Sequence, residues 1–283
     1  MVSQIAADAL TLHPWNVGFE WVDATGPFTA LSTEQVRRFD DDGFIVVRDL
    51  FTADEIAEVR DILDGFEAES DAFLKQQAGE RIMIAESGAI TFSAHLVARS
   101  PELAAFARHP KLVDICLDLV GADVNVYWDQ AVYKKPEKPR RFPWHQDNGY
   151  AYVEPQQYLT CWIPLTDATR DNGCPQVARG LHRHGTLQHS YVEPLGYECF
   201  SQPPSEVMIA EAPVGSAVVF SSLTPHLTGP NTTDAVRKAY ILQYAPAGAE
   251  KLQGDPYAGP AVARETQDNP KRQFSVARDG KPA

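Results

Sequence analysis

The chain has 283 residues, of which 44% are hydrophobic, 22% charged and 10% aromatic. This composition is typical of a folded globular protein rather than a disordered or fibrous one. At this length about 70 to 75% of the unfolded chain's surface can be buried, so a deep pocket does not depend on disulfides. Asp and Glu number 38 against 25 Lys and Arg, and the net charge of -13 argues against nucleic-acid binding.

The cysteines lie far apart and form no CxxC pair, which favours isolated reduced thiols and a cytoplasmic location. They are Cys116, Cys161, Cys174 and Cys199. No apolar run is long enough for a membrane span, and the first residues lack the basic and apolar regions of a signal peptide. We therefore expect a cytoplasmic monomer or homodimer that has neither a nucleic-acid partner nor a membrane partner.

The first part of the chain, from about residue 31 to 121, is predicted to be mostly helical. Four helix starts are expected, two at capping boxes and two at prolines in a position that the first helical turn tolerates. They are Ser32, Thr52, Pro101 and Pro110. Between the first two helices, the β-branched run at residues 43–47 predicts a buried strand.

From about residue 122 to 246 the pattern changes to short apolar segments separated by Pro, Gly, Asn and Asp. Their spacing is typical of a jelly roll or a sandwich. The best predicted strands are 124–133, 158–164, 206–212, 216–221 and 236–244. Residues 247–283 are rich in Pro, Gly and charge, so we expect an extended C-terminal tail. No segment has the composition of a linker, and we predict one domain over residues 1–283.

His145 and Asp147 are two positions apart, so on a strand both side chains would leave the same face. His226 follows the predicted strand at 216–221. Two histidines and one carboxylate form the facial triad that holds non-heme Fe(II) and leaves coordination positions open. Zinc accepts similar ligands, so these three residues alone leave the metal undecided.

Arg237 lies on the next predicted strand and favours one kind of metal site. Its planar guanidinium can bind the distal carboxylate of a keto acid through two parallel hydrogen bonds. A hydrolytic metal site would not require such a group. Gln130 also fits a pocket, because on a strand it shares a face with Trp128 and Val132 and is the polar residue among apolar ones.

The order and spacing of these motifs resemble those of the phytanoyl-CoA dioxygenase family of Fe(II)- and 2-oxoglutarate-dependent oxygenases, from about residue 31 to 246. The matching segments are 31–35 with 42–47, 144–147 with Tyr150, 160–165, 172–174, 180–182, and His226 with Asn231 and Arg237. Each motif is weak alone, and the set is specific.

The resemblance implies a mainly β fold with helical cover. It implies a double-stranded β-helix, a cupin-like jelly roll, with N-terminal helices packed on one sheet. It also implies that His145, Asp147 and His226 bind iron as the catalytic centre and that Arg237 pairs with the C5 carboxylate of 2-oxoglutarate. The further expected cosubstrate contacts are Gln130, Thr160, Trp162 and Thr228.

The implied activity is a dioxygenase reaction that consumes 2-oxoglutarate and O2 and releases succinate and CO2. Related halogenases carry a small residue at the position of Asp147, so we expect oxygenation.

Residues 173–175 and 178–182 depart from the family's usual Gly-Cys-Leu and Pro-Gly-Ser-His stretches, which leaves the identity of the substrate open. Hydroxylation is the expected outcome, with desaturation and epoxidation as alternatives. An acyl-CoA 2-hydroxylase of the phytanoyl-CoA type and a cupin-like, non-oxidative metal protein or isomerase also stay open.

Side chains near the iron motif predict the substrate contacts, which are Tyr133, Phe142, Asn148 and Tyr150. An aromatic pocket of this kind favours a small, largely apolar metabolite or natural-product intermediate of secondary metabolism. The basic run before His145 is either a solvated loop or an attractor for an anion. It comprises Lys134, Lys135, Lys138, Arg140 and Arg141.

His182 and His184 form a second pair with the same spacing. No glutamate follows at the spacing of a cupin-type metal site. We therefore expect His182 to be structural and His184 to be exposed.

Overall fold

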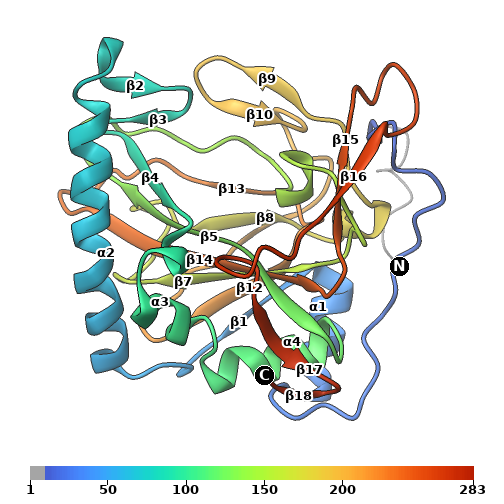
Figure 1. Cartoon of the computed structure of the whole chain (residues 1–283). Coiled ribbons are helices and arrows are strands. Elements are labelled where there is room, and N and C mark those ends of the chain that lie inside the picture. The colour runs from blue at the N-terminus through green and yellow to red at the C-terminus, as the bar shows by residue number, and fades with distance from the viewer. Residues whose placement is uncertain (1–9) are drawn as a thin grey trace.

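The computed structural model describes residues 10–283 and places helices against a large antiparallel sheet (Figure 1). The helices are α1 (Thr33–Asp42), α2 (Ala53–Leu74), α3 (Pro101–Phe106) and α4 (Pro110–Leu119). Ser32 and Thr52 cap α1 and α2 through the two predicted capping boxes. The prolines that begin α3 and α4 occupy the first helical turn, where the missing N–H has no partner to lose. All four predicted helix starts are confirmed.

The large sheet has 10 strands in the order β1-β12-β7-β14-β5-β4-β3-β2, with β17 paired to β5 and β18 paired to β17. Its strands are β1 (Phe44–Val47), β2 (Arg81–Ile82), β3 (Ala85–Glu86), β4 (Ile90–Ala94), β5 (Val124–Lys134), β7 (Leu159–Pro164), β12 (Ala217–Ser221), β14 (Arg237–Pro246), β17 (Ser275–Arg278) and β18 (Lys281–Pro282). The central strands β7, β14 and β5 pair antiparallel over most of their length.

A smaller sheet has 3 strands in the order β11-β8-β13. They are β8 (Pro175–Ala178), β11 (Val207–Ile209) and β13 (His226–Thr228). A further sheet joins β6 (Val153–Glu154), β15 (Glu250–Gln253) and β16 (Ala263–Thr266), and a hairpin joins β9 (Ser190–Val192) and β10 (Gly196–Glu198).

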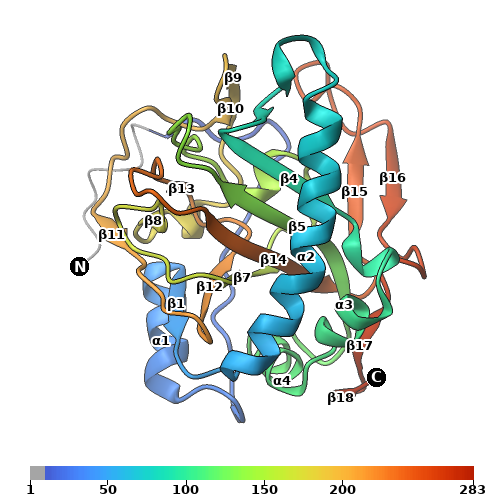
Figure 2. The same ribbon diagram turned by 90° about the vertical axis from the view of Figure 1, so that its left-hand side faces the viewer.

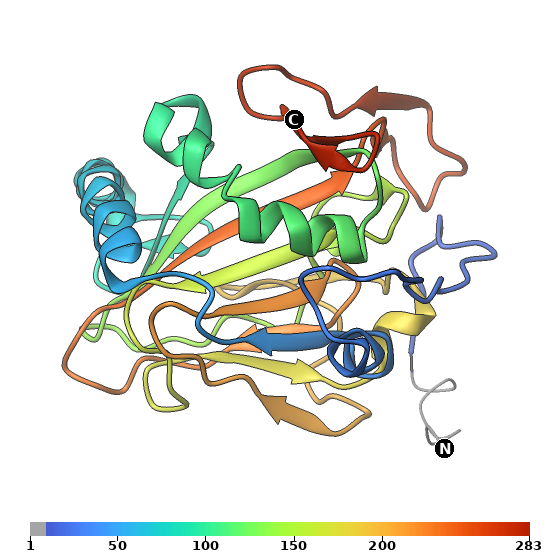
Figure 3. The ribbon, with the colours of Figure 1, turned by 90° about the horizontal axis from the view of Figure 1, so that it is seen from below.

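The central strands bury both faces, so alternate residues serve two different cores. On β14, Tyr240 and Leu242 belong to the cluster that includes the apolar residues of α2, α3 and α4. Ala239 and Ile241 belong to the cluster between the large sheet and the smaller one. Helices α2, α3 and α4 accordingly lie along one side of the large sheet (Figures 2 and 3). The arrangement confirms the predicted jelly roll with helices packed on one sheet.

The five predicted strands of the β region correspond to β5, β7, β11, β12 and β14. The mostly helical assignment of residues 31–121 was incomplete, because β2, β3 and β4 extend the large sheet there. The short strands β8 and β13 were not predicted. One domain over the whole chain stays a prediction.

The prediction of an extended C-terminal tail was wrong, because this segment forms strands that pair with the sheets. Strand β17 pairs with β5 in the large sheet, and its residues Val276 and Ala277 are buried. Strand β15 pairs with both β6 and β16. The segment after residue 246 is therefore an integral part of the fold rather than a covering on its surface.

Gly43 joins the helical layer to the β layer at the end of α1. Its φ of +85° lies in the left-handed region, and an added Cβ would come within 2.6 Å of His182 Nδ1 and 2.7 Å of Thr224 Oγ1. Its carbonyl accepts hydrogen bonds from the Ser221 amide, at 3.1 Å, and from Thr224 Oγ1, at 2.7 Å. Only glycine meets both the backbone and the space requirement here.

We expect Gly43→Ala to lower the free energy of unfolding by about 2 to 5 kcal/mol, the sum of left-handed strain and overpacking. Gly65→Ala is the matched control, because Gly65 lies in α2 and an added Cβ there meets nothing within 4 Å. That variant should gain about 0.5 to 1 kcal/mol from helix propensity. Urea denaturation measures both values, and equal effects would contradict the role given to Gly43.

Candidate active site

His145 and His226 lie side by side through an isolated antiparallel bridge. Each amide donates to the carbonyl of the other residue, at 2.9 Å in both directions. Asp147 begins a 3-10 turn (Asp147–Gly149) rather than continuing a strand. The predicted proximity is therefore found, although the strand geometry used to predict it is not.

The donor atoms of these three side chains all lie within 4.8 Å of one another. Among residues 10–283, they form the one group of His, Cys, Asp or Glu side chains that could hold a metal ion in this way. His145 and His226 are buried. Two imidazoles and one carboxylate suit Fe(II) and leave positions for other ligands.

Backbone carbonyls fix both imidazoles in the orientation that a metal requires. His145 Nδ1 lies 2.9 Å from the Pro143 carbonyl, and His226 Nδ1 lies 3.0 Å from the Thr224 carbonyl. A carbonyl only accepts, so each Nδ1 carries the proton and each Nε2 keeps a free lone pair. Burial, followed by the neighbouring His226, holds the pKa of His145 well below its ordinary value, so that imidazole is neutral.

Asp147 is oriented by a threonine from β7. Thr160 Oγ1 donates to Asp147 Oδ2 at 2.5 Å, and Gln243 Nε2 donates to Thr160 Oγ1 at 3.3 Å. The other carboxylate oxygen, Oδ1, lies 3.8 Å from His145 Nε2. One oxygen of Asp147 is thus held by the protein, and the other faces the imidazole.

Arg237 is the first residue of β14, and its side chain is 1% exposed. Its Nη1 donates a long hydrogen bond of 3.4 Å to the Val132 carbonyl, while Nε and Nη2 have no partner among the described residues. Its guanidinium carbon lies 5.2 Å from the centre of the Trp162 ring. Burial lowers the pKa of Arg237 to about 9, against an opposing effect of the Cys174 thiol, and no carboxylate of residues 10–283 forms an ion pair with the guanidinium. A buried guanidinium with unmet donors is suited to binding an anion.

A cavity of about 60 Å³ connects the two features. Its lining includes His145, Asp147 and His226 at one side and Arg237 at another. All the other residues predicted to contact a cosubstrate line it too, namely Gln130, Thr160, Trp162 and Thr228. The remaining walls are apolar, from Phe92, Val132, Phe142, Phe220 and Ile241.

A larger cavity of about 420 Å³ adjoins the first and shares part of its lining. The shared residues are Phe92, Gln130, Phe142, His145 and Asp147. Two of the predicted substrate contacts, Phe142 and Tyr150, line this space. The rest of the wall comes from Ile84, Tyr127, Trp128, Ala151, Tyr158, Gln243, Lys251, Glu265, Gln267, Arg272 and Gln273.

Tyr133 and Asn148 are not found in either lining, so their predicted substrate contacts need correction. Tyr133 is buried on the helix side of β5, where its hydroxyl donates to Asp64 at 2.6 Å. Alternation along β5 places it opposite Gln130, which faces the cavity. Asn148 donates to Thr186 at 2.7 Å and accepts from the Val153 amide at 3.0 Å, which commits it to the local turn.

The basic run before His145 is not a free cationic patch, although Lys138 within it is exposed. Ion pairs join Lys135 to Glu67 and Asp71, Lys138 and Arg140 to Glu86, and Arg141 to Glu198. Lys134 is 1% exposed and donates to the carbonyls of Arg140, Thr228 and Gly229. Burial and then the charge of Arg237 hold the pKa of Lys134 well below its ordinary value.

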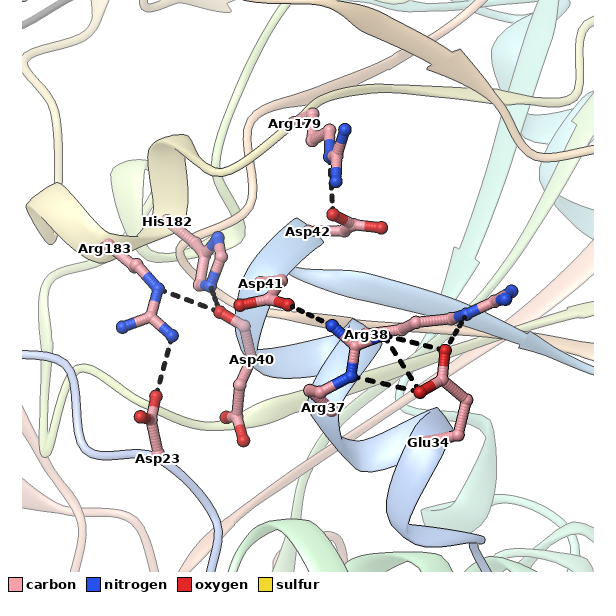
Figure 4. Close-up of polar contacts among 10 residues, drawn as sticks. All are labelled: Asp23, Glu34, Arg37, Arg38, Asp40, Asp41, Asp42, Arg179, His182 and Arg183. Carbon is pink, nitrogen blue, oxygen red and sulfur yellow. Dashed lines mark hydrogen bonds and ion pairs between the residues drawn. The ribbon is translucent and has the colours of Figure 1, made fainter. Parts of the chain in front are cut away.

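His182, of the second histidine pair, has a structural role at α1 (Figure 4). His182 is buried, and its Nε2 lies 3.0 Å from the Asp40 carbonyl, which also accepts from Arg183 Nε at 2.9 Å. The His182 ring meets Trp21 edge to face at 4.4 Å. His184 is partly buried rather than exposed.

A model of the family described as Phytanoyl-CoA dioxygenase (PhyH) matches residues 39–239, which is more than half of the chain. The chain belongs to this family. It is therefore an Fe(II)- and 2-oxoglutarate-dependent dioxygenase, with iron as its metal and 2-oxoglutarate as its cosubstrate. Membership excludes the alternative of a non-oxidative, cupin-like metal protein.

This dioxygenase is similar to curated proteins that are named for different substrates. It is 27% identical over 246 residues to a probable phytanoyl-CoA dioxygenase of Caenorhabditis elegans, a match that covers 79% of this chain and 78% of that protein. It is 27% identical over 235 residues to an ectoine dioxygenase of Stutzerimonas stutzeri, with 76% of each chain covered.

Solved structures agree on the fold of the dioxygenase. The non-heme alpha ketoglutarate dependent carbocyclase SnoK from nogalamycin biosynthesis matches with a TM-score of 0.66 at 22% identity, over 87% of this chain and 97% of that one. EctD from S. alaskensis, solved with 2-oxoglutarate and 5-hydroxyectoine, matches with a TM-score of 0.64 at 24% identity, over 90% of each chain.

The sequence of the dioxygenase did not predict the C-terminal part of the cavity wall. Residues Lys251, Glu265, Gln267, Arg272 and Gln273 all come from the segment expected to be a tail. The charge and the Pro and Gly content of this segment do not indicate that it lines a pocket.

Across residues 10–283, no helix has the length and apolar character that crossing a membrane requires.

Lys134→Met tests whether this buried amine stabilises the fold next to the candidate site. We expect the dioxygenase variant to lose about 1 to 3 kcal/mol of folding stability, because the Thr228 and Gly229 carbonyls lose their donor. Lys138→Met removes a lysine whose side chain is 45% exposed and should change stability by less than about 1 kcal/mol. Thermal and urea unfolding report both variants, and an unaffected Lys134→Met would show that these carbonyls do not need the amine.

Proposed function

We propose that the enzyme holds Fe(II) through His145, Asp147 and His226, binds 2-oxoglutarate through Arg237, and hydroxylates a small molecule in the larger cavity. The observation that carries the proposal is the buried Arg237. Its guanidinium has donors without partners and lines the same small cavity as the three candidate metal ligands. A dicarboxylate that reaches from the metal to the arginine would satisfy both ends.

The donor set supports the metal assignment. Each histidine presents Nε2, because its Nδ1 is committed to a backbone carbonyl. Asp147 has one oxygen held by Thr160 and the other turned toward His145. Outer hydrogen bonds of this kind fix the tautomer and orientation of metal ligands.

Arg237 would hold the distal carboxylate of 2-oxoglutarate through its unpartnered Nε and Nη2 donors. Thr228 and Gln130 offer polar groups on the same cavity wall, and Trp162 forms the surface beside the guanidinium. The carboxylate would give the buried Arg237 guanidinium an anionic partner. Buried charges in proteins are tolerated when they are paired in this way.

Fe(II) with 2-oxoglutarate and O2 supplies the oxidising chemistry, in which the cosubstrate leaves as succinate and CO2. The chain supplies orientation and a water-poor space. The carbonyls of Pro143 and Thr224 hold the two imidazoles, and Thr160 holds Asp147. The apolar walls of the small cavity exclude water from the reacting groups.

The larger cavity supports a compact substrate, and its lining revises the expectation of a largely apolar one. Phe92, Phe142 and Tyr150 form an aromatic side near the candidate iron site. Lys251 and Arg272 place positive charge in the same wall. We propose a small molecule with an apolar part and a polar part, as a metabolite or natural-product intermediate, and take hydroxylation as the outcome to be tested.

Anaerobic addition of Fe(II) and 2-oxoglutarate should produce a weak visible charge-transfer band. Arg237→Ala should raise the 2-oxoglutarate concentration needed for half of that band by about 10- to 150-fold, the equivalent of a charge-assisted pair of 1.5 to 3 kcal/mol. Arg179→Ala, which removes an exposed arginine paired with Asp42, should leave it unchanged. The assignment of Arg237 is wrong if both variants titrate like the wild type, and a wild type without the band contradicts the iron site.

Thr160→Val tests the orientation of Asp147 with little change of shape. Loss of the hydrogen bond to Asp147 Oδ2 should weaken Co(II) affinity by about 10- to 100-fold. Thr160→Ser keeps the hydroxyl and should bind close to wild type. Optical titration with Co(II) measures all three proteins without requiring turnover, and equal affinities for the Val and Ser variants would rule out this role for the hydroxyl.

A further inference from the structure

The C-terminal segment forms the polar wall of the larger cavity. Lys251 comes from β15, Glu265 from β16, and Gln267, Arg272 and Gln273 from the loop before β17. All of them lie beyond residue 239, where the family match ends. This part of the cavity wall is therefore built from residues that lie outside the family match.

Arg272 places a positive charge in this wall without a carboxylate partner. It makes no ion pair with a carboxylate of residues 10–283, and its one side-chain hydrogen-bond partner is His95, with Nη1 2.9 Å from Nε2. A guanidinium carries five N–H donors in a planar fork. The contact with His95 uses one edge and leaves further donors for a ligand in the cavity.

His95 holds the guanidinium in a defined position. Its ring meets the cavity residue Trp128 edge to face at 4.3 Å, and its backbone has a φ of 59°, which is uncommon for a residue other than glycine. Burial and then the charge of Arg272 lower the pKa of His95, so the neutral ring accepts the N–H of the arginine. Unusual backbone geometry of this kind concentrates at binding sites.

The loop that carries Arg272 is closed by its own amides. Gln273 Nε2 donates to Gln267 Oε1 at 2.8 Å, and Gln273 Oε1 accepts from the Asn269 amide at 3.0 Å. Gln273 Nε2 also donates to the Tyr127 carbonyl at 3.5 Å. These contacts commit both glutamines to the protein and pre-organise the arginine, which lowers the entropy lost on binding.

The other charged groups in the wall are Lys251, Glu265 and Asp147. Lys251 and Glu265 are cross-strand partners of β15 and β16, but no ion pair joins their side chains. Glu265 is exposed and accepts from Gln253 at 3.0 Å. Asp147 is held by Thr160 and belongs to the candidate metal site. Arg272 and Lys251 therefore give this wall two positive charges, neither of which is paired with a carboxylate of residues 10–283, and Arg272 is the one whose planar fork His95 holds in position.

We propose that the substrate of this enzyme carries an oxyanion group, a carboxylate or a phosphonate, which Arg272 binds at the C-terminal wall while the apolar part lies along the aromatic residues near the iron site. This inference rests on the proposed function, because the same cavity adjoins the candidate metal ligands. An oxyanion matches the planar fork of arginine in two parallel hydrogen bonds. Binding at both ends would present one carbon of the apolar part to the reacting centre.

The test compares acids with neutral amides of the same shape. Wild-type enzyme is loaded with Fe(II) and saturating 2-oxoglutarate without O2, so that Arg237 is not free to bind a probe. Equilibrium dialysis then measures 3-phenylpropanoate against 3-phenylpropanamide, octanoate against octanamide, and phenylphosphonate. We expect each acid to bind at least about tenfold more tightly than its amide. The stronger of the carboxylate and phosphonate probes identifies the oxyanion.

Arg272→Gln should reduce the preference for acids to about twofold or less. Lys271→Gln is the matched control, because it removes the same charge from the neighbouring exposed residue and should keep the full preference. Equal binding of acid and amide by the wild type, binding of no acid in the panel, or a preference that survives Arg272→Gln overturns the inference. Arg272→Gln should keep the anaerobic charge-transfer band, whereas a wild type without that band refutes the proposed function instead.

Discussion

The Arg237 guanidinium lies buried between two sheets, and no carboxylate of residues 10–283 forms an ion pair with it. Removing a charge from water costs several kcal/mol unless a partner of opposite sign compensates it. The neighbouring strand adds a buried amine, Lys134, which is met by backbone carbonyls alone. The unmet donors of the Arg237 guanidinium therefore leave a place for a bound anion. The small cavity, the three candidate metal ligands and the aromatic lining are all arranged around that unmet charge.

Backbone contacts place the candidate metal ligands more firmly than side-chain packing could. The paired amide and carbonyl hydrogen bonds of His145 and His226 fix the separation of the two residues, and carbonyls two residues away fix both rings. The Thr224 that holds His226 also donates to the carbonyl of Gly43, at the end of α1. The helical layer thus supports the candidate iron site through a glycine that tolerates no side chain. Sites held in this way need little reorganisation when they bind.

Two parts of the larger cavity's lining differ in origin as well as in chemistry. The candidate metal ligands come from the part of the chain that the family match covers, residues 39–239. A separate part of the lining comes from the C-terminal segment, in which the loop before β17 presents Arg272. A fold can keep one reaction centre and vary a separate part of the cavity wall, so that different members bind different substrates. Function resides in such sites rather than in the fold itself. Curated relatives named for phytanoyl-CoA and for ectoine are consistent with such variation.

Local sequence determined the features that neighbouring residues control. Capping boxes fixed the helix starts, and alternation placed Gln130 on the cavity face of its strand. Motif order predicted that His145, Asp147 and His226 form one site, whereas the turn at Asp147 and the bridge between the two histidines bring them together in the tertiary structure. The same alternation, fully applied, would have turned Tyr133 away from the cavity. Only the tertiary structure decided that the basic run is paired with distant carboxylates and that the C-terminal segment lines the cavity. These outcomes depend on contacts between residues far apart in the chain, and no local periodicity, cap or spacing encodes such contacts.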